Sequence, residues 1–128
     1  MADGYKESIT AVQSFLNELN RVLNAPNSKL EIYPREDKEW EYTTTYCLQT
    51  LQFDTEDVKL ELLKLTTKDY IETRDDERNK KSNRYYIFGI NIEKREIYIK
   101  VKIESYDDKI VLCMSFHFAK YPLKWAYK

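Results

Sequence analysis

Apolar side chains recur at helical spacing near the start of the chain. They occupy Ile9, Val12, Phe15, Leu16, Leu19 and Leu23. Because these positions fall on one stripe of a helix, residues 5–24 are predicted to form an amphipathic helix packed on a core. The segment NAPNS ends it. Residues 30–33 then predict a short strand, broken by Pro34 and followed by a charged connector.

Two shorter helices are predicted in the next part of the chain. Residues 43–53 begin with threonines that favour a helix cap, and Asp54 or Thr55 caps a second helix. The apolar residues expected to face inward from that second helix are Val58, Leu60, Leu62, Leu63 and Leu65. The phrase TTKDYIE, residues 66–72, is expected to end the helical region. Residues 73–83 have no apolar side chain and predict an exposed loop.

Three strands are predicted in the last third of the chain, at residues 84–90, 95–104 and 109–118. Aromatic and β-branched residues favour the first strand, in which Gly89 permits a bulge. In the second strand Ile97, Ile99, Val101 and Ile103 face one side, whereas Tyr98, Lys100 and Lys102 face the other. In the third strand Ile110, Leu112, Met114 and Phe116 share one face, and Val111, Cys113, Ser115 and His117 share the other.

Helices followed by antiparallel strands predict an α+β fold, with N-terminal helices packed on a twisted antiparallel sheet. The 128 residues fit one domain spanning 1–128. If Ile103 pairs with Ile110, Tyr98 lies opposite Ser115 and diagonal to His117. A register two residues away places Tyr98 directly opposite His117. Either arrangement gathers a phenol, an imidazole and two ammoniums on the non-core face, which is either a site or an ordinary wet face of a sheet.

Composition and charge narrow the classes of function. The net charge is −1, whereas nucleic-acid-binding domains are often basic. However, residues 84–128 hold nine Lys and Arg against five Asp and Glu, so this part alone has a charge of +4. No apolar stretch approaches the length of a membrane span, and the first residues do not form a secretion signal, so we expect no membrane association.

The two cysteines and the single histidine are too dispersed for a zinc site, and we expect no metal and no small-molecule cofactor. Cys47 and Cys113 lie in apolar surroundings far apart in the sequence. They are expected to be buried and reduced, which favours a cytoplasmic location.

Five phrases in order resemble the motility quorum-sensing regulator (MqsR) family of toxins. They are the short helix at 43–53 and the segments Leu51–Val58, Leu65–Tyr70, Ile97–Val101 and Ser115–Phe116. The resemblance covers about residues 43–118. It implies a RelE-like fold, a toxin of a bacterial type II toxin–antitoxin pair that cleaves messenger RNA without a metal, and a cognate antitoxin protein as partner.

The catalytic positions of the family carry over unevenly. Its tyrosine matches Tyr98, and the lysine that follows in the same phrase matches Lys100. One family lysine falls at Glu72, a glutamine falls at or beside Tyr85, and a second lysine falls at His117. The resemblance therefore makes His117, Tyr98, Glu72 and Tyr85 the candidate catalytic residues.

Metal-free RNA cleavage needs a base for the 2′-hydroxyl, a cation for the phosphorane and an acid for the leaving oxygen. Candidates are Glu72 or His117 as base, Lys100 or Arg84 as cation, and His117 or Tyr98 as acid. RNA is expected along Arg84, Lys100, Lys102, Lys120 and Lys124. Its bases would stack on Tyr85 or Trp125, unless the tail with Trp125 and Tyr127 instead folds back onto the core.

Three function classes therefore remain open from the sequence. One is the endoribonuclease toxin. The second is a catalytically silent module on the same fold that uses the aromatic, basic tail to hold RNA or a partner. The third is a purely protein-binding domain, which the sequence pI of about 5.9 and the acidic first half of the chain favour.

Overall fold

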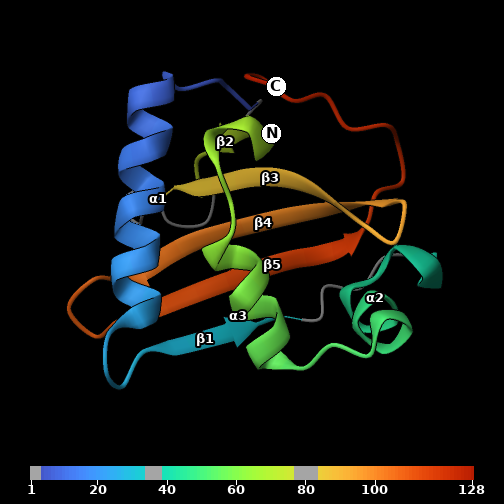
Figure 1. Ribbon diagram of the computed structural model, residues 1–128, viewed down its shortest axis with the longest axis horizontal. Helices are drawn as coiled ribbons and strands as arrows, with labels where there is room; N and C mark the ends of the chain where they lie inside the picture. Colours follow the sequence, from blue (N-terminus) through green and yellow to red (C-terminus); the bar gives the residue numbers. More distant parts are fainter. Residues whose placement is uncertain (1–3, 34–38, 77–83) are drawn as a thin grey trace.

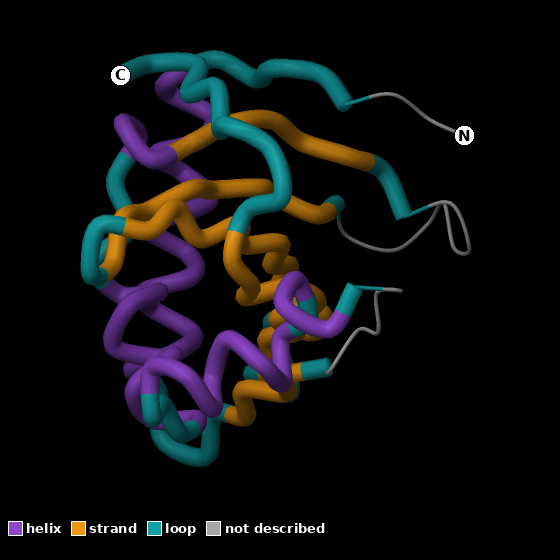
Figure 2. The backbone as a smooth tube through the Cα atoms, turned by 90° about the vertical axis from the view of Figure 1, so that its right-hand side faces the viewer, coloured by secondary structure: helices purple, strands orange, loops and turns teal. Residues whose placement is uncertain are grey.

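Helices and strands form two layers in the computed structural model, which describes residues 4–33, 39–76 and 84–128. Helices α1 and α3 lie against one face of a sheet, and α2 lies beside the end of β5 (Figures 1 and 2). The elements are α1 (Ile9–Asn24), β1 (Lys29–Ile32), η1 (Trp40–Tyr42), α2 (Thr44–Leu51), α3 (Thr55–Leu63), η2 (Thr67–Asp69), β2 (Tyr70–Arg74), β3 (Tyr85–Ile92), β4 (Arg95–Ser105) and β5 (Ile110–Phe118). The predicted α+β class is confirmed.

The sheet has five strands in the order β1-β5-β4-β3-β2. Strands β3, β4 and β5 pair antiparallel with their sequence neighbours, as predicted, and β2, which the sequence did not predict, pairs antiparallel with β3. Strand β1 pairs parallel with β5, so the sheet is mixed and the expectation of a wholly antiparallel sheet is wrong. A parallel neighbour needs a long connection, and here everything between β1 and β5 supplies it.

Side-chain caps define the helix starts. The hydroxyl of Ser8 accepts a hydrogen bond from the Ala11 amide, and the Thr43 hydroxyl accepts one from the Tyr46 amide. Asp54 and Asp57 form a reciprocal capping box at the start of α3. These caps satisfy amides that the first helical turn leaves unpaired. They confirm both predicted short helices, and the second is capped by Asp54.

Three predicted details of the helical half are wrong. Residues 5–8 are not helical, because the backbone of Tyr5 exchanges two hydrogen bonds with Thr73. Residues 70–72 belong to strand β2 instead of the end of a helix, and Tyr70 is fully buried there. Leu60 is 48% exposed. It lies two residues from both Val58 and Leu62, about 200° around the helix from each, so it points away from the core.

A bulge in β5 reverses the faces that strict alternation predicts. Lys100 pairs with Ser115 whereas the next residue, Val101, pairs with Cys113, which leaves Met114 without an opposite residue. As a result Val111 and Cys113 are buried in the core before the bulge, and Phe116 and Phe118 after it. The predicted core positions Ile110, Leu112 and Met114 are only partly buried. The assignments of Phe116 to the core and of Ser115 and His117 to the other face are correct.

The carboxyl-terminal tail folds back along the sheet. The Trp125 indole N–H donates to the Gly89 carbonyl at 2.8 Å, and the Ala126 amide donates to the Tyr70 carbonyl at 3.0 Å. The Tyr127 hydroxyl donates to the Glu7 carbonyl, and its ring stacks on Tyr70. The folded-back position of Trp125 and Tyr127 is thus the one observed.

Both cysteines are buried and form no disulfide. Burial raises the pKa of the Cys47 and Cys113 thiols to about 12. Because the thiolate is the reactive form, neither thiol should react with an aromatic disulfide reagent at pH 8 while the protein is folded. Both should react within minutes in denaturant. Equal rates in folded and denatured protein, followed by absorbance, would contradict the burial.

Candidate functional site

The candidate site lies on the sheet face opposite α1 and α3, here called the second face. Two cross-strand rows define it. One row runs Gly89–Tyr98–His117 across β3, β4 and β5. The other runs Glu72–Ile87–Lys100–Ser115 across β2 to β5. Since Ile87 and Ser115 are buried on this face, it is not a plain wet face.

Tyr98 and His117 lie directly opposite each other, which is the second of the two registers considered from the sequence. Their rings stack with centroids 5.1 Å apart and planes 19° apart. Both side chains are half-buried. The stack places a phenol and an imidazole side by side on the second face, with Lys100 one row away on the same strand as Tyr98.

The hydrogen bond of His117 defines its tautomer. Nδ1 lies 2.9 Å from the Phe118 carbonyl oxygen. A carbonyl oxygen only accepts, so Nδ1 carries a proton and the lone pair of the neutral ring is on Nε2. Nε2 is therefore the atom that can accept a proton from a substrate.

A buried ionic network occupies the second face beside Lys100. The ammonium of Lys102, with 3% of its side chain exposed, lies 3.0 Å from an Asp76 carboxylate oxygen and 2.9 Å from one of Glu104. The Tyr85 ring lies beneath two ammoniums, with Nζ of Lys100 4.6 Å and Nζ of Lys102 4.9 Å from its centroid. Such cation–π contacts hold cations over an aromatic face.

This network changes the roles expected of Lys102 and Tyr85. Burial alone lowers the pKa of the Lys102 ammonium, but hydrogen bonds to Glu104 and Asp76 outweigh it, and the net pKa is raised. Lys102 is therefore a buried cation that is already paired with two carboxylates, so the geometry does not support its predicted role as a phosphate ligand. Tyr85 is 5% exposed, and its ring supports Lys100 instead of presenting a face to a nucleobase.

The tail forms one border of the second face. A Cβ at Gly89 would lie 2.5 Å from Leu123 Cδ1 and 3.2 Å from the Trp125 indole nitrogen. Glycine is thus needed for the close approach of the tail, whereas pairing between β3 and β4 continues through Gly89 without the predicted bulge. Glu96 accepts a hydrogen bond from the Leu123 amide. Leu123 therefore lies over Gly89, which is directly opposite Tyr98.

Two of the predicted site residues lie away from the stacked pair. Glu72 is on β2, three strands from His117 and about 14 Å across the sheet. Its carboxylate accepts from Arg74 at 2.6 Å and contacts Gly4. Glu72 therefore does not act on the same atom as His117.

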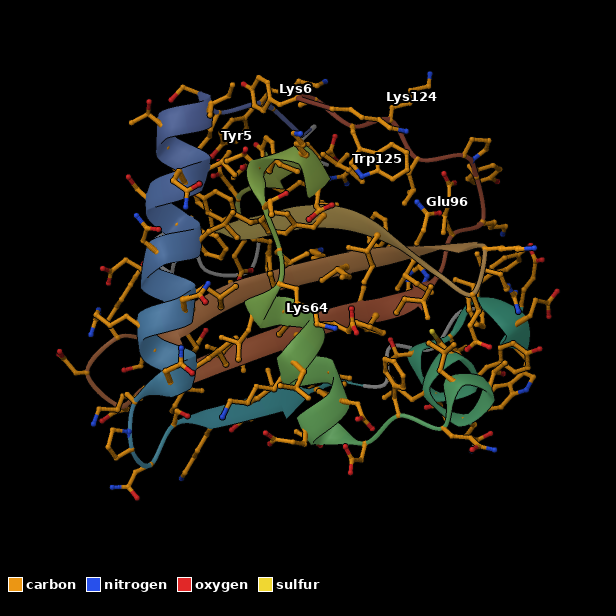
Figure 3. The ribbon with its side chains drawn as sticks, in the orientation of Figure 1. Tyr5, Lys6, Lys64, Glu96, Lys124 and Trp125 are labelled. Atoms are coloured by element: carbon orange, nitrogen blue, oxygen red, sulfur yellow. The ribbon has the colours of Figure 1, made fainter. Side chains whose placement is uncertain are left out.

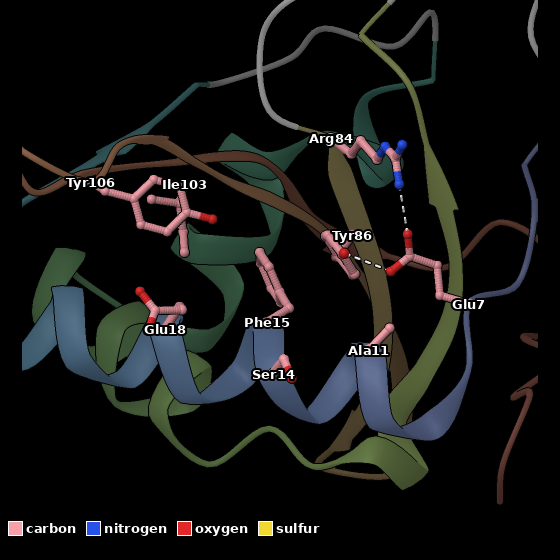
Figure 4. A pocket seen from close by; sticks show the side chains of 9 residues that line it. All are labelled: Glu7, Ala11, Ser14, Phe15, Glu18, Arg84, Tyr86, Ile103 and Tyr106. Carbon is pink, nitrogen blue, oxygen red and sulfur yellow. Dashed lines mark hydrogen bonds and ion pairs between the residues drawn. The ribbon is translucent and has the colours of Figure 1, made fainter.

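Arg84 belongs to the helix side of the sheet. Its guanidinium donates to Glu7 at 3.0 Å, and Glu7 also accepts from the Tyr86 hydroxyl at 2.6 Å (Figure 4). Burial and the bond to Glu7 raise the pKa of Tyr86 above its usual value. Arg84 and Tyr86 line a shallow pocket of about 470 Å³ between α1 and the sheet, so Arg84 is not near the Tyr98–His117 pair.

The remaining predicted cations lie beyond the strands. Lys120 follows β5, bonds to Glu39 at 2.6 Å and lies 5.8 Å from the Tyr42 ring centroid. Lys124 points outward from the tail (Figure 3). The exposed loop predicted at residues 73–83 lies mostly outside the described residues. Thr73 and Arg74 belong to β2, and Asp76 contacts Lys102.

Arg95 and Trp40 are two further candidate residues that the sequence analysis missed. The Arg95 guanidinium lies 3.4 Å from the centroid of the Phe118 ring, and Trp40 is 53% exposed. The sequence around Arg95 and Trp40 gives no signal of a site, because the rings that they contact come from other segments of the chain.

In the described ranges, no three His, Cys, Asp or Glu side chains group closely enough to hold a metal ion. The described helices include none that is long and apolar enough to cross a membrane. Comparisons with protein-family models, curated proteins and solved structures found no match to this chain.

Because Lys102 is buried in an ionic network, replacing it should lower the stability of the protein far more than replacing an exposed lysine. Lys102→Met leaves Asp76 buried without its cation, and should lower the free energy of unfolding by about 3 kcal/mol. Lys64→Met is the matched control, because Lys64 is 71% exposed in a surface pair and should change stability by less than about 0.5 kcal/mol. Urea unfolding measures both.

A double variant separates charge from packing. Adding Asp76→Asn to Lys102→Met should recover part of the lost stability, because it removes the uncompensated carboxylate. Additive losses in the double variant would show that Lys102 contributes only packing.

Proposed function

We propose that this protein is a metal-independent endoribonuclease, the toxin of a bacterial type II toxin–antitoxin pair acting in the cytoplasm. The observation that carries the proposal is the stacked Tyr98–His117 pair, with Lys100 beside it on the second face. The resemblance to the MqsR family supports it, since Tyr98 and Lys100 match family positions. The same resemblance makes an antitoxin protein the cognate partner.

The pair offers both proton transfers of RNA cleavage. Nε2 of His117 accepts the proton of the 2′-hydroxyl, and the 2′-oxygen then attacks the adjacent phosphorus. The bond from phosphorus to the 5′-oxygen breaks, and the Tyr98 hydroxyl donates its proton to that leaving oxygen. A phenol carries its proton at neutral pH, so it suits the role of acid. Lys100 stabilises the negative charge of the phosphorane.

A binding module without catalysis is the second candidate. The observation that favours it is the buried network, since the Tyr85 hydroxyl and the Lys102 ammonium both contact Asp76. Such a module would bind single-stranded RNA, or a protein partner, without cutting it. RNA binding in the absence of cleavage would select this candidate.

Two substitutions test the proton-transfer roles. His117→Ala and Tyr98→Phe should each slow RNA cleavage by about 10²- to 10⁴-fold and abolish growth arrest on expression. Because both side chains are half-buried, each should change stability by no more than about 1 kcal/mol. Single-turnover cleavage of a labelled RNA, read beside the thermal midpoint, separates catalysis from folding.

Tyr106→Phe is the matched control for Tyr98→Phe, because Tyr106 is exposed in the turn between β4 and β5. The Tyr106→Phe variant should cleave RNA at the parental rate. If a stably folded His117→Ala variant cleaved RNA at the parental rate, the Tyr98–His117 pair would not be catalytic.

Metal dependence gives an independent test. Because the proposed chemistry uses only side chains of this protein, cleavage by the purified protein should continue at an undiminished rate in excess chelator. The control is a known magnesium-dependent nuclease, which should stop under the same conditions. Loss of activity in chelator with recovery on adding Mg²⁺ would refute the mechanism.

A further inference from the structure

An aromatic and cationic cluster lies where β5 ends beside η1 and α2. The ring of Trp40 packs edge-on against Tyr46 with centroids 5.8 Å apart, and Tyr46 packs edge-on against Phe118 with centroids 6.0 Å apart. Arg95 stacks on Phe118, and Lys120 lies near Tyr42. We call Trp40, Tyr42, Tyr46, Arg95 and Lys120 the end platform.

Backbone geometry holds Arg95 in its position. Residues Glu93 and Lys94 both have positive φ, at 51° and 67°, and form a tight turn between β3 and β4. Arg95 begins β4 directly after this turn. The pairing of Ile97 with Phe118 then brings the Arg95 guanidinium onto the Phe118 ring, 3.4 Å from its centroid.

The charge of Arg95 is not neutralised by an ion pair with any described residue, since no carboxylate there lies within 4.0 Å of it. Arg95 is exposed, while Phe118 beneath it is 2% exposed. One face of the guanidinium therefore covers the core, and the cation is presented outward. Acidic residues are also near, because Glu39 pairs with Lys120 and Glu41 is exposed in η1.

Trp40 is the second anchor of the end platform. A half-exposed indole contributes little to the core, although aromatic side chains provide large contact areas when a partner covers them. Alternating aromatic rings and cations are the usual means of holding single-stranded nucleic acid, with bases on the rings and phosphates on the cations.

We propose that the end platform binds the same single-stranded RNA that reaches the catalytic pair, with a base stacked on Trp40 and phosphates at Arg95 and Lys120. This inference rests on the proposed ribonuclease function. Phe118 and Lys120 follow His117 within three residues, with Phe118 in the core and His117 on the second face. RNA that binds at both places therefore passes around the end of β5.

Continuity with His117 is what favours RNA over a protein partner. A protein partner would also cover Trp40 and Arg95, but it would give no reason for the cluster to follow the candidate proton-transfer residue His117 so closely along β5. The RNA proposal requires that nucleotides flanking the cleaved bond strengthen binding, and that very short substrates gain nothing from the platform.

The experiment measures binding of RNA oligonucleotides in which every 2′-hydroxyl is replaced by 2′-fluoro, so that cleavage cannot occur. Trp40→Ala should weaken binding of a twelve-nucleotide oligomer roughly 5- to 100-fold, the effect expected for loss of one stacked base. A dinucleotide should bind equally to the parent and to the variant. Arg95→Gln should reduce the slope of log K against log salt by about 0.7, the loss of one phosphate contact.

Two matched controls accompany these variants. Arg21→Gln removes an exposed arginine on α1 and should leave the salt slope unchanged. Trp125→Phe should retain the quenching of tryptophan fluorescence by RNA, because that quenching arises at Trp40. Circular dichroism confirms that each variant remains folded.

The outcomes separate this inference from the proposed function. Tight RNA binding that needs Trp40 and Arg95, without cleavage of natural RNA, would support RNA binding by the end platform and contradict the proposed ribonuclease function. Cleavage with binding unchanged in Trp40→Ala and Arg95→Gln overturns the platform alone. Failure of the parent to bind the oligomer, or binding of the antitoxin that depends on Trp40 while RNA binding does not, also overturns the platform.

Discussion

The register between β4 and β5 is the constraint on which both faces of the sheet depend. The extra residue at Met114 shifts the alternation of β5, so that Phe116 and Phe118 enter the core while Ser115 and His117 face the second face. A strand without this bulge would exchange those two sets, because a shift of one residue turns every side chain to the opposite face. The core thereby fixes the Tyr98–His117 stack: large rings on one side of β5 hold the imidazole on the other.

A second consequence follows along β4. Its strict alternation buries four branched residues on one face, and on the other face it places Glu96, Tyr98, Lys100 and Lys102 in series. Each of these polar residues has a different partner: the tail at Glu96, the imidazole at Tyr98, the Tyr85 ring at Lys100 and two carboxylates at Lys102. A buried ion pair adds little net stability, but it strongly disfavours arrangements that leave one partner alone. The network therefore specifies where Lys100 lies more than it strengthens the fold.

Much of this arrangement is predictable from the sequence, and the exceptions have physical causes. The β4 pattern alternates cleanly, and the capping residues Thr43 and Asp54 have local signals, so these elements are predicted correctly. The β5 segment VLCMSFHF has apolar or small residues at nearly every position, so its sequence does not show which side chains face the core or where the bulge lies. Strand β2 is short and polar, and only the burial of Tyr70 and the backbone pairing with Tyr5 identify it as a strand. The burial of Lys102 is not predictable from its neighbours, because a charged residue is normally exposed unless it is paired, and its partner Asp76 lies 26 residues away. The end platform likewise joins residues from four separate segments.

The chemical groups at the ends of the RNA fragments distinguish the proposed mechanism from other routes of RNA cleavage. In the proposed mechanism, attack by the 2′-oxygen with His117 as base and Tyr98 as acid leaves a 2′,3′-cyclic phosphate on one fragment and a 5′-hydroxyl on the other. Mass spectrometry of the fragments produced by the purified protein from a short RNA identifies these ends. The proposed mechanism predicts cyclic phosphate and 5′-hydroxyl ends. It also predicts that the RNA is not cleaved after a nucleotide whose 2′-hydroxyl is replaced by hydrogen. Fragments that carry a 5′-phosphate and a 3′-hydroxyl would contradict it.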